Sequence, residues 1–220
     1  MRWVEKPVYS KPIKTIPKER QLYFDQLGTF SEGQPTFDKI RKTLREGDVI
    51  AYHMKRNEAR LAVAKGKLTR LGYRVLDYGH LAILTRQDGR LRLFSSQSFK
   101  GANTLEGVES LRDHSFDVYR LNRWEKVDRK RFHEFVEKSQ EKAGSWIGYD
   151  FSGMFGLWNS KLDPAHADEI GHDYICSTIV AAALYYAGAD MKVSNRKGYL
   201  DLVSPKQVVT SHGVLREIQE

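Results

Sequence analysis

One apolar stretch, Asp173–Gly188, constrains the fold more than any other part of the chain. Apolar residues recur in it at steps of three and four, the spacing of one face of an α-helix; they are Ile179, Val180, Ala183, Leu184 and Ala187. A helix with so broad an apolar face has to be buried against another layer of the protein. Gly188 marks its expected end, because glycine readily adopts the left-handed conformation that closes helices.

The only cysteine of the chain, Cys176, lies at the start of this predicted helix. The first turn of a helix offers free backbone N–H groups and the positive end of the helix dipole, and both favour thiolate over thiol. Since the thiolate is the nucleophile, this position suits a catalytic cysteine. The alternative is that Cys176 is a small apolar side chain packed in the core, as free cysteines often are. The helix pattern alone leaves both interpretations open.

The length and composition are typical of a globular protein with one sizeable domain. The chain has 220 residues, and 11% of them are aromatic, which argues against disorder. A single cysteine excludes an intramolecular disulfide, and no group of residues has the spacing of a structural zinc site. We therefore expect neither a bound metal nor a cofactor.

Terminal sequence and charge bear on the compartment and the partners of the protein. No stretch approaches the roughly 18 apolar residues of a membrane span, and the first residues lack the apolar region of a signal peptide. The sequence thus indicates a cytoplasmic protein, or an exported envelope protein whose leader has been removed. The net charge of +8 comes from basic residues interspersed with acidic ones, as in residues 125–131. This pattern favours a solvated surface attracted to anionic polymers or membranes over nucleic-acid binding.

The order of patterns along the chain predicts an α+β fold. Residues 1–35 contain four prolines and indicate an extended arm, whose second half docks on the core through Tyr23, Phe24, Leu27 and Phe30. Residues 36–220 are expected to form a single domain. Helices are predicted at 36–46, at 128–144, from Cys176 and from Ser204, and strands at 48–52, 78–84, 91–99, 116–121 and 214–218. Residues 54–72 show no pattern that assigns them.

A thiol hydrolase needs a histidine to take the proton of its cysteine, and His80 has the most distinctive setting of the seven histidines. It opens an apolar strand directly after Gly79, where the absence of a side chain lets a substrate or another backbone approach. Asp88-Gly89 is a tight-turn signal that pairs this strand with the next one as an antiparallel hairpin. The alternative is a hydrogen-bonded histidine at the edge of a strand, without a catalytic role.

Five short motifs follow one another in a particular order: Gly47-Asp48-Val49-Ile50, Gly79-His80-Leu81-Ala82-Ile83-Leu84, Tyr149-Asp150-Phe151, Tyr174-Ile175-Cys176-Ser177 and Ser204-Pro205. Their order resembles that of the circularly permuted NlpC-type papain-like cysteine amidases and peptidases. More narrowly, it is similar to their YiiX-like branch, which is related to lecithin:retinol acyltransferase. The resemblance covers roughly residues 47–210. It implies a papain-like core whose antiparallel sheet carries His80 as general base and packs against the helix of the nucleophile Cys176.

Two positions depart from the pattern of that family. Thr178 stands where an acidic residue often follows the nucleophile. The third catalytic residue is expected in residues 94–98, which contain no carboxylate. Gln97 is our choice, because its side-chain carbonyl can accept a hydrogen bond from the imidazole, and Ser96 is the alternative. A neutral partner stabilises an imidazolium less than a carboxylate would, so a weaker cysteine–histidine ion pair is expected.

An acyl-transfer site also needs donors for the developing oxyanion. The backbone N–H of Cys176 is one candidate, and the side chain of Tyr52 or of Tyr174 is a second. A half-buried core tyrosine accounts for either residue equally well.

Three functions are consistent with these residues. The first is a thiol hydrolase that cleaves an amide or ester, in a peptide, cell-wall or lipid-linked acyl substrate, through an acyl-enzyme on Cys176. The second is an acyltransferase or phospholipase-like enzyme that uses the same cysteine and histidine on a lipid. The third is a binding domain in which a basic surface holds an anionic polymer and Cys176 is structural.

Overall fold

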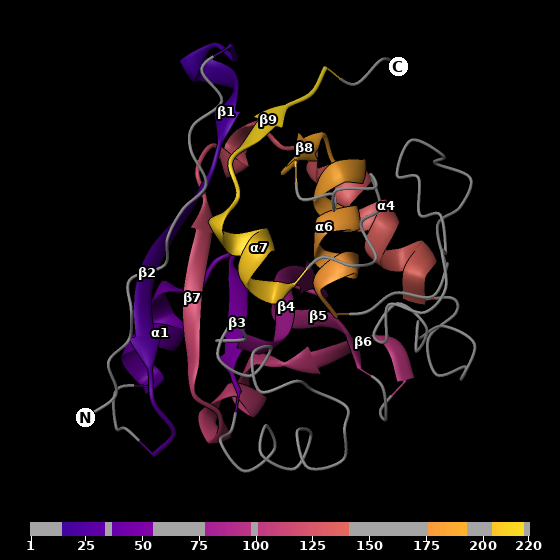
Figure 1. Cartoon of the computed structure of the whole chain (residues 1–220). Helices are drawn as coiled ribbons and strands as arrows, with labels where there is room; N and C mark the ends of the chain where they lie inside the picture. The colour runs from indigo at the N-terminus through magenta and orange to yellow at the C-terminus, as the bar shows by residue number, and fades with distance from the viewer. Residues whose placement is uncertain are drawn as a thin grey trace, which may run out of the picture.

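A computed structural model of the chain describes residues 15–33, 37–54, 78–97, 101–140, 176–192 and 204–217. These residues form a mixed α+β fold built on a six-stranded antiparallel sheet (Figure 1). The strands lie in the order β2-β7-β3-β4-β5-β6. Their bounds are β2 (Phe24–Phe30), β7 (Phe116–Leu121), β3 (Val49–His53), β4 (Tyr78–Gln87), β5 (Arg90–Gln97) and β6 (Gly101–Gly107). The expected strands at 48–52, 78–84 and 116–121 are confirmed, and the one at 91–99 is confirmed as far as Gln97, where the described residues stop. The strand expected at 214–218 is shorter and lies at Gly213–Leu215, and β6 was not expected.

Successive side chains of a strand point to opposite faces of the sheet, and in this sheet both faces carry apolar side chains. Helices therefore cover both faces. Leu81 and Ile83 of β4 belong to one apolar core, together with α4 (Arg129–Gln140), α6 (Cys176–Tyr186) and α7 (Pro205–Thr210). We call this side the α6 face. Ala82 and Leu84 belong to a second core with α1 (Phe37–Thr43) and the 3-10 helix η2 (Val108–Asp113). We call this side the α1 face. Figure 1 shows α4, α6 and α7 grouped together on one side of the sheet.

Local sequence signals account for where the helices begin and end, although the helix expected at 36–46 is shorter and spans Phe37–Thr43. Oδ1 of Asp128 accepts a hydrogen bond from the Arg131 backbone, as an N-cap of α4 should. Ser204 and Gln207 form a reciprocal capping box at the start of α7. Gly188 follows α6 with a φ of +90°. The predicted cysteine helix is buried along nearly its whole length, from Ser177 to Leu184.

A small second sheet joins the two ends of the described chain. It contains β1 (Gln21–Leu22), β9 (Gly213–Leu215) and β8 (Ala189–Asp190), in that order. The 3-10 helices η1 (Lys18–Arg20) and η3 (Trp124–Lys126) complete the described elements.

The expected docking of the N-terminal arm is only half right. Phe24 and Phe30 are each 1% exposed, but Tyr23 and Leu27 are 38% and 47% exposed. A register shift in the pairing of β2 with β7 lies between Gln26 and Gly28, so Leu27 is the extra residue of a β-bulge. Its side chain therefore faces solvent.

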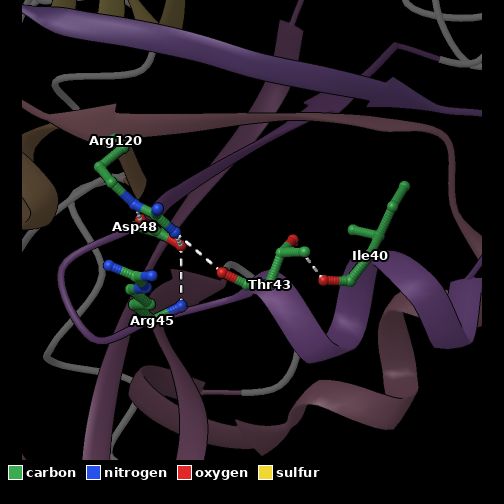
Figure 2. A network of polar contacts seen from close by, with 5 residues as sticks. All are labelled: Ile40, Thr43, Arg45, Asp48 and Arg120. Atoms are coloured by element: carbon green, nitrogen blue, oxygen red, sulfur yellow. Dashed lines mark hydrogen bonds and ion pairs between the residues drawn. The ribbon is translucent and has the colours of Figure 1, made fainter.

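The Gly47-Asp48 motif closes one end of the sheet (Figure 2). Asp48 is 1% exposed, and its two carboxylate oxygens accept hydrogen bonds of 2.7 and 2.8 Å from the Arg120 guanidinium. Oδ2 of Asp48 also accepts a 2.8 Å bond from the Arg45 backbone, and Arg120 donates to the carbonyl of Thr43. We call these contacts of Asp48 and Arg120 the Arg120 clamp. They hold the end of α1 against β3 and β7.

Candidate active site

Cys176 is the first residue of α6 and is half-buried where that helix meets the sheet. Three backbone N–H groups donate to its sulfur: those of Leu81, Ser177 and Cys176 itself. Two of them belong to the first turn of α6, and the third belongs to β4. The sulfur therefore lies at the junction of the helix start and the strand that carries His80.

Burial raises the pKa of the Cys176 thiol above its ordinary value. The hydrogen bonds from Leu81, Ser177 and Cys176 lower the pKa, as the helix position predicts, but their effect is smaller than that of burial. The backbone groups at the helix start therefore favour the thiolate, as expected, but burial favours the protonated thiol more strongly. A reactive thiolate at this site requires a positive charge or a base beside the sulfur.

His80 lies directly before Leu81 in β4, so the structure brings the backbone of the histidine to the sulfur. In the sheet His80 is paired with Tyr52 of β3, and the centroids of the two rings are 5.3 Å apart. The Nε2 atom of His80 is buried. The register puts His80 on the α1 face with Tyr52, whereas Leu81 points to the α6 face.

The described pairing between β4 and β5 ends near Leu81, the residue that contacts Cys176. Cross-strand pairs of β4 and β5 run from Gln87 and Arg90 to Ile83 and Phe94. Beyond that pair the backbone N–H of Leu81 donates to Cys176 instead. The sulfur of Cys176 therefore lies beside the backbone of β4 at Leu81.

The candidates for the third catalytic residue lie at the end of β5. Ser96 is fully buried. Gln97 is the last residue of β5, and its backbone pairs with Gly101 of β6. If the register of the β4–β5 hairpin is continued beyond Ile83 and Phe94, Gln97 falls level with His80 and Ser96 with Leu81. The described pairs of β4 and β5 end at Ile83 and Phe94, and β5 has a register shift against β6 between Ser95 and Gln97, so the position of Gln97 and Ser96 relative to Cys176 stays a prediction.

Of the two tyrosine candidates, only Tyr52 lies within the described residues. Tyr174 lies outside the described residues. Tyr52 is half-buried between His80 and His114, with ring centroids 5.3 Å from each. Burial, and to a lesser extent the charge of Glu106, raises the pKa of Tyr52, so its hydroxyl stays protonated and remains a hydrogen-bond donor. Tyr52 contacts the proposed base directly, from the α1 face.

One cluster near this region was not expected from the sequence. Asp117 of β7 is 1% exposed, and its Oδ1 lies 3.0 Å from Nε2 of His53. The hydroxyl of Tyr78 donates to Oδ2 of Asp117 and lies 2.6 Å from the hydroxyl of Tyr119. Although burial acts to raise it, the pKa of Asp117 is lowered by contacts with His53, Tyr78 and Thr29. The sequence feature that could have indicated this cluster is the carboxylate of Asp117 inside the apolar pattern of residues 116–121.

No protein-family model matches the chain, and no curated protein matches it. Within the described ranges, none of the helices has the length and apolar character needed to cross a membrane. In the same part of the chain, no group of three or more His, Cys, Asp or Glu side chains is arranged to hold a metal ion.

Proposed function

We propose that the protein is a thiol hydrolase that cleaves an amide or ester bond through an acyl-enzyme on Cys176, with His80 as general base. One observation carries the proposal: the sulfur of Cys176 receives a hydrogen bond from the backbone of Leu81, the residue that follows His80. A cysteine at a helix start and a histidine on the adjoining strand form the pair that thiol hydrolases require.

The proposed reaction proceeds in two halves. His80 accepts the thiol proton while the sulfur attacks the substrate carbonyl carbon, and the carbonyl π electrons move to oxygen. When the tetrahedral intermediate collapses, the bond to the leaving group breaks and His80 returns the proton to that group. A water molecule, deprotonated by His80, then attacks the acyl-enzyme, and the acid is released as Cys176 regains its proton. Because burial raises the pKa of Cys176, proton removal by His80 has to accompany the attack.

Backbone groups provide the donors for the oxyanion in this proposal. The N–H groups of Cys176, Ser177 and Leu81 already converge on the sulfur, so an oxyanion formed beside it lies within their reach. Two separate elements, α6 and β4, hold these donors rigidly. Tyr52 contacts the ring of His80 and is better placed to orient that ring than to bind the oxyanion.

The third catalytic role is proposed for Gln97. Continuing the hairpin register puts Gln97 level with His80, which is the position from which a neighbouring strand can support an imidazole. Ser96 is the alternative, and its complete burial is consistent with a packing role as well.

We propose a permuted papain-like core for the fold. The antiparallel sheet that carries His80, the packing of α6 on that sheet, and the short helix α7 after Ser204 agree with the arrangement that the family resemblance implies. The substrate class proposed on the same basis is a peptide-type or cell-wall amide, or a lipid-linked acyl group. Transfer of the acyl group to an acceptor other than water is the alternative outcome of the same chemistry.

The reactivity of Cys176 tests this proposal, because it is the only cysteine in the chain. Its alkylation by iodoacetamide is measured against pH in the parent, in His80→Ala and in His133→Ala. His133 is a matched control, since it lies on α4 and pairs with Glu46 at 2.8 Å. We expect the parent to react well below pH 8.5, and His80→Ala to be about tenfold slower near pH 6.5, because the base that removes the thiol proton during the attack is then missing. His133→Ala should match the parent.

Acylation by p-nitrophenyl acetate, followed by the mass of the intact protein, gives a second readout on the same three proteins. The parent and His133→Ala should gain and then lose an acetyl group, and His80→Ala should do so more slowly. A thiol that reacts only above about pH 8.5, irrespective of His80, would show an inert core cysteine. That result would favour the binding-domain function instead.

A further inference from the structure

Five segments meet at one end of the molecule, around the last turn of α6. Backbone hydrogen bonds join the start of α4 to Ala187 and the segment after β9 to Gly188. The guanidinium of Arg20 donates to the backbone of β9, and that of Arg123 donates to the backbone of η1. In Figure 1 this end is at the top, where β1, β9 and β8 lie. Because Cys176 begins α6 and that helix is about 16 Å long, this end is remote from the proposed nucleophile.

Positive charge is concentrated at this end. Residues 18–20, 123–131 and 213–217 contain eight Lys and Arg side chains and four Asp and Glu side chains. All the other described residues together contain twelve Lys and Arg and thirteen Asp and Glu. The surplus of positive charge among the described residues therefore lies entirely at this end, which we call the basic end. The sequence hides it, because the three ranges come together only in the fold.

The charges of the basic end face solvent. Four of its basic side chains are exposed and form no ion pair with the described residues; they are Lys18, Lys126, Arg129 and Lys130. Beside α1, by contrast, the exposed Arg41 and Arg112 each pair with a carboxylate at 3.0 Å. Exposed positive charge that the chain itself does not neutralise is available to an anionic partner.

Aromatic rings lie among these charges. The guanidinium carbons of Arg131 and Arg216 are 4.7 and 4.0 Å from the ring centroids of Tyr186 and Tyr185. Stacking of this kind leaves the edge of a guanidinium able to donate to phosphate oxygens. Tyr23 is 38% exposed and adjoins the basic end, since its backbone N–H donates to the segment that leads into η3. A tyrosine ring is amphipathic and suits the boundary between headgroups and acyl chains of a bilayer.

We propose that the basic end is a docking surface for a lipid bilayer that carries anionic headgroups. Its charges come from five segments and form a broad surface, which matches the extended array of phosphates on a bilayer. The ring of Tyr23 enters the headgroup region beside them. The inference does not depend on the proposed function, because it uses no residue of the proposed active site. With the basic end docked, Cys176 at the other end of α6 stays outside the contact.

Co-sedimentation with vesicles tests this proposal. The protein is mixed with vesicles of phosphatidylcholine alone, or with about 30% phosphatidylglycerol added, at about 0.1 M and about 0.5 M salt. We expect binding to the anionic vesicles and not to the neutral ones. Binding should be at least about tenfold weaker at the higher salt, because salt screens exposed charges.

Charge reversals locate the surface. Arg129→Glu/Lys130→Glu and, separately, Lys18→Glu/Lys126→Glu should each weaken binding about tenfold or more. The first variant should fold well, because glutamate is favourable in the first turn of a helix. The second changes two different segments, so agreement between the two variants would show that one surface carries the binding.

Two controls accompany these variants. Lys39→Glu/Lys42→Glu makes the same change of charge at two exposed positions of α1 and should stay within about twofold of the parent. Cys176→Ala should bind like the parent.

Several results would overturn the proposal. An equal loss in the α1 variant would show that binding follows net charge alone, and equal binding to neutral vesicles would exclude an electrostatic contact. If only one of the two reversals at the basic end weakened binding, the surface would not be the one described. Tighter binding to a DNA duplex than to anionic vesicles at the same salt would indicate a nucleic-acid surface instead. Loss of binding in Cys176→Ala would place the contact at the proposed active site.

Discussion

Asp48 and Asp117 are both almost completely buried carboxylates, but their partners give them different roles. Asp48 is held by the two-pronged hydrogen bond of a guanidinium, which is strong and geometrically specific. Asp117 is held by hydroxyl groups and an imidazole, so its contacts depend on the exact position of β4. The first carboxylate holds the end of α1, and the second one ties side chains of β2, β3 and β4 to β7.

At the residue scale, Gly47 shows how closely that clamp is packed. Its φ is +84°, and a Cβ at this position would overlap the indole ring of Trp124. Gly89 has a similar φ of +74°, but among the described residues no atom lies within 4 Å of its Cβ position. We expect Gly89→Ala to lower the free energy of unfolding by about 1–2 kcal/mol, the cost of the left-handed conformation. Gly47→Ala should lower it by about 2–3 kcal/mol more, because the overlap adds to that cost.

Urea unfolding of the two variants and the parent measures this difference. Equal losses for the two glycines would contradict it, because they would show that the Trp124 ring moves aside without cost.

Individual residues of the candidate site were predictable to different degrees. Cys176 and His80 stand out in the sequence, since one is the only cysteine and the other opens an apolar strand after a glycine. The donor from Leu81 was not predictable, because a backbone N–H carries no signature in the side chain. The raised pKa of Cys176 was also missed, since burial depends on how α6 packs rather than on its helical position.

At the element scale, the predicted and missed elements differ in length and pattern. The strands β3, β4 and β7 and the helix α6 were visible because each has a sustained apolar period. The strand β6 begins with Gly101 and has no such alternation, and β1 and β8 are only two residues long. These strands form because neighbouring strands pair with them, and the local sequence does not encode that pairing.

The burial of α6 leads to a prediction about that element. Ile179 lies one turn after Cys176 and is fully buried between helix and sheet. Ile179→Ala should lower the free energy of unfolding by about 2–5 kcal/mol, through lost apolar burial and the cavity that remains. Leu27→Ala provides the comparison, since Leu27 is 47% exposed in the bulge of β2 and should cost less than about 0.5 kcal/mol.

Both variants are compared with the parent by urea unfolding. A loss below about 1 kcal/mol for Ile179→Ala would mean that the contact between α6 and the sheet is looser than described.

At the scale of the whole molecule, strand order creates contacts that the sequence order hides. The strand β7 lies between β2 and β3, although many residues separate it from both in the chain. This insertion brings Asp117 within reach of Tyr78. An α+β class with antiparallel pairing was predictable from the order of patterns, but this strand order was not, because several orders satisfy the same local pairing rules.

The whole molecule should lose stability in alkaline solution. Burial raises the pKa values of Cys176, Tyr52 and Tyr78 in the folded protein. Each group holds its proton more tightly when folded, so its contribution to stability is complete below its unfolded pKa and is lost as pH rises above it. With unfolded values of about 8.5 for cysteine and about 10 for tyrosine, the urea midpoint should fall progressively between about pH 8 and pH 11.

Cys176→Ala serves as the control for this pH dependence. It should remove the earliest part of the decline and retain the part that begins near pH 10. A parent midpoint that stays constant up to pH 11 would contradict the burial of these three groups.

The small sheet that joins the two ends of the chain also determines how the molecule responds to mechanical load. In β1 and β9, Gln21 pairs with Val214 and Leu22 with Gly213. Because the two strands are antiparallel, the chain leads into β1 and out of β9 at the same end of this ladder. Tension between those segments peels the pairs apart in turn, beginning with Gln21 and Val214, rather than shearing them together. The pairing of β1 with β9 in the small sheet should therefore open under a small force, before the six-stranded sheet is loaded.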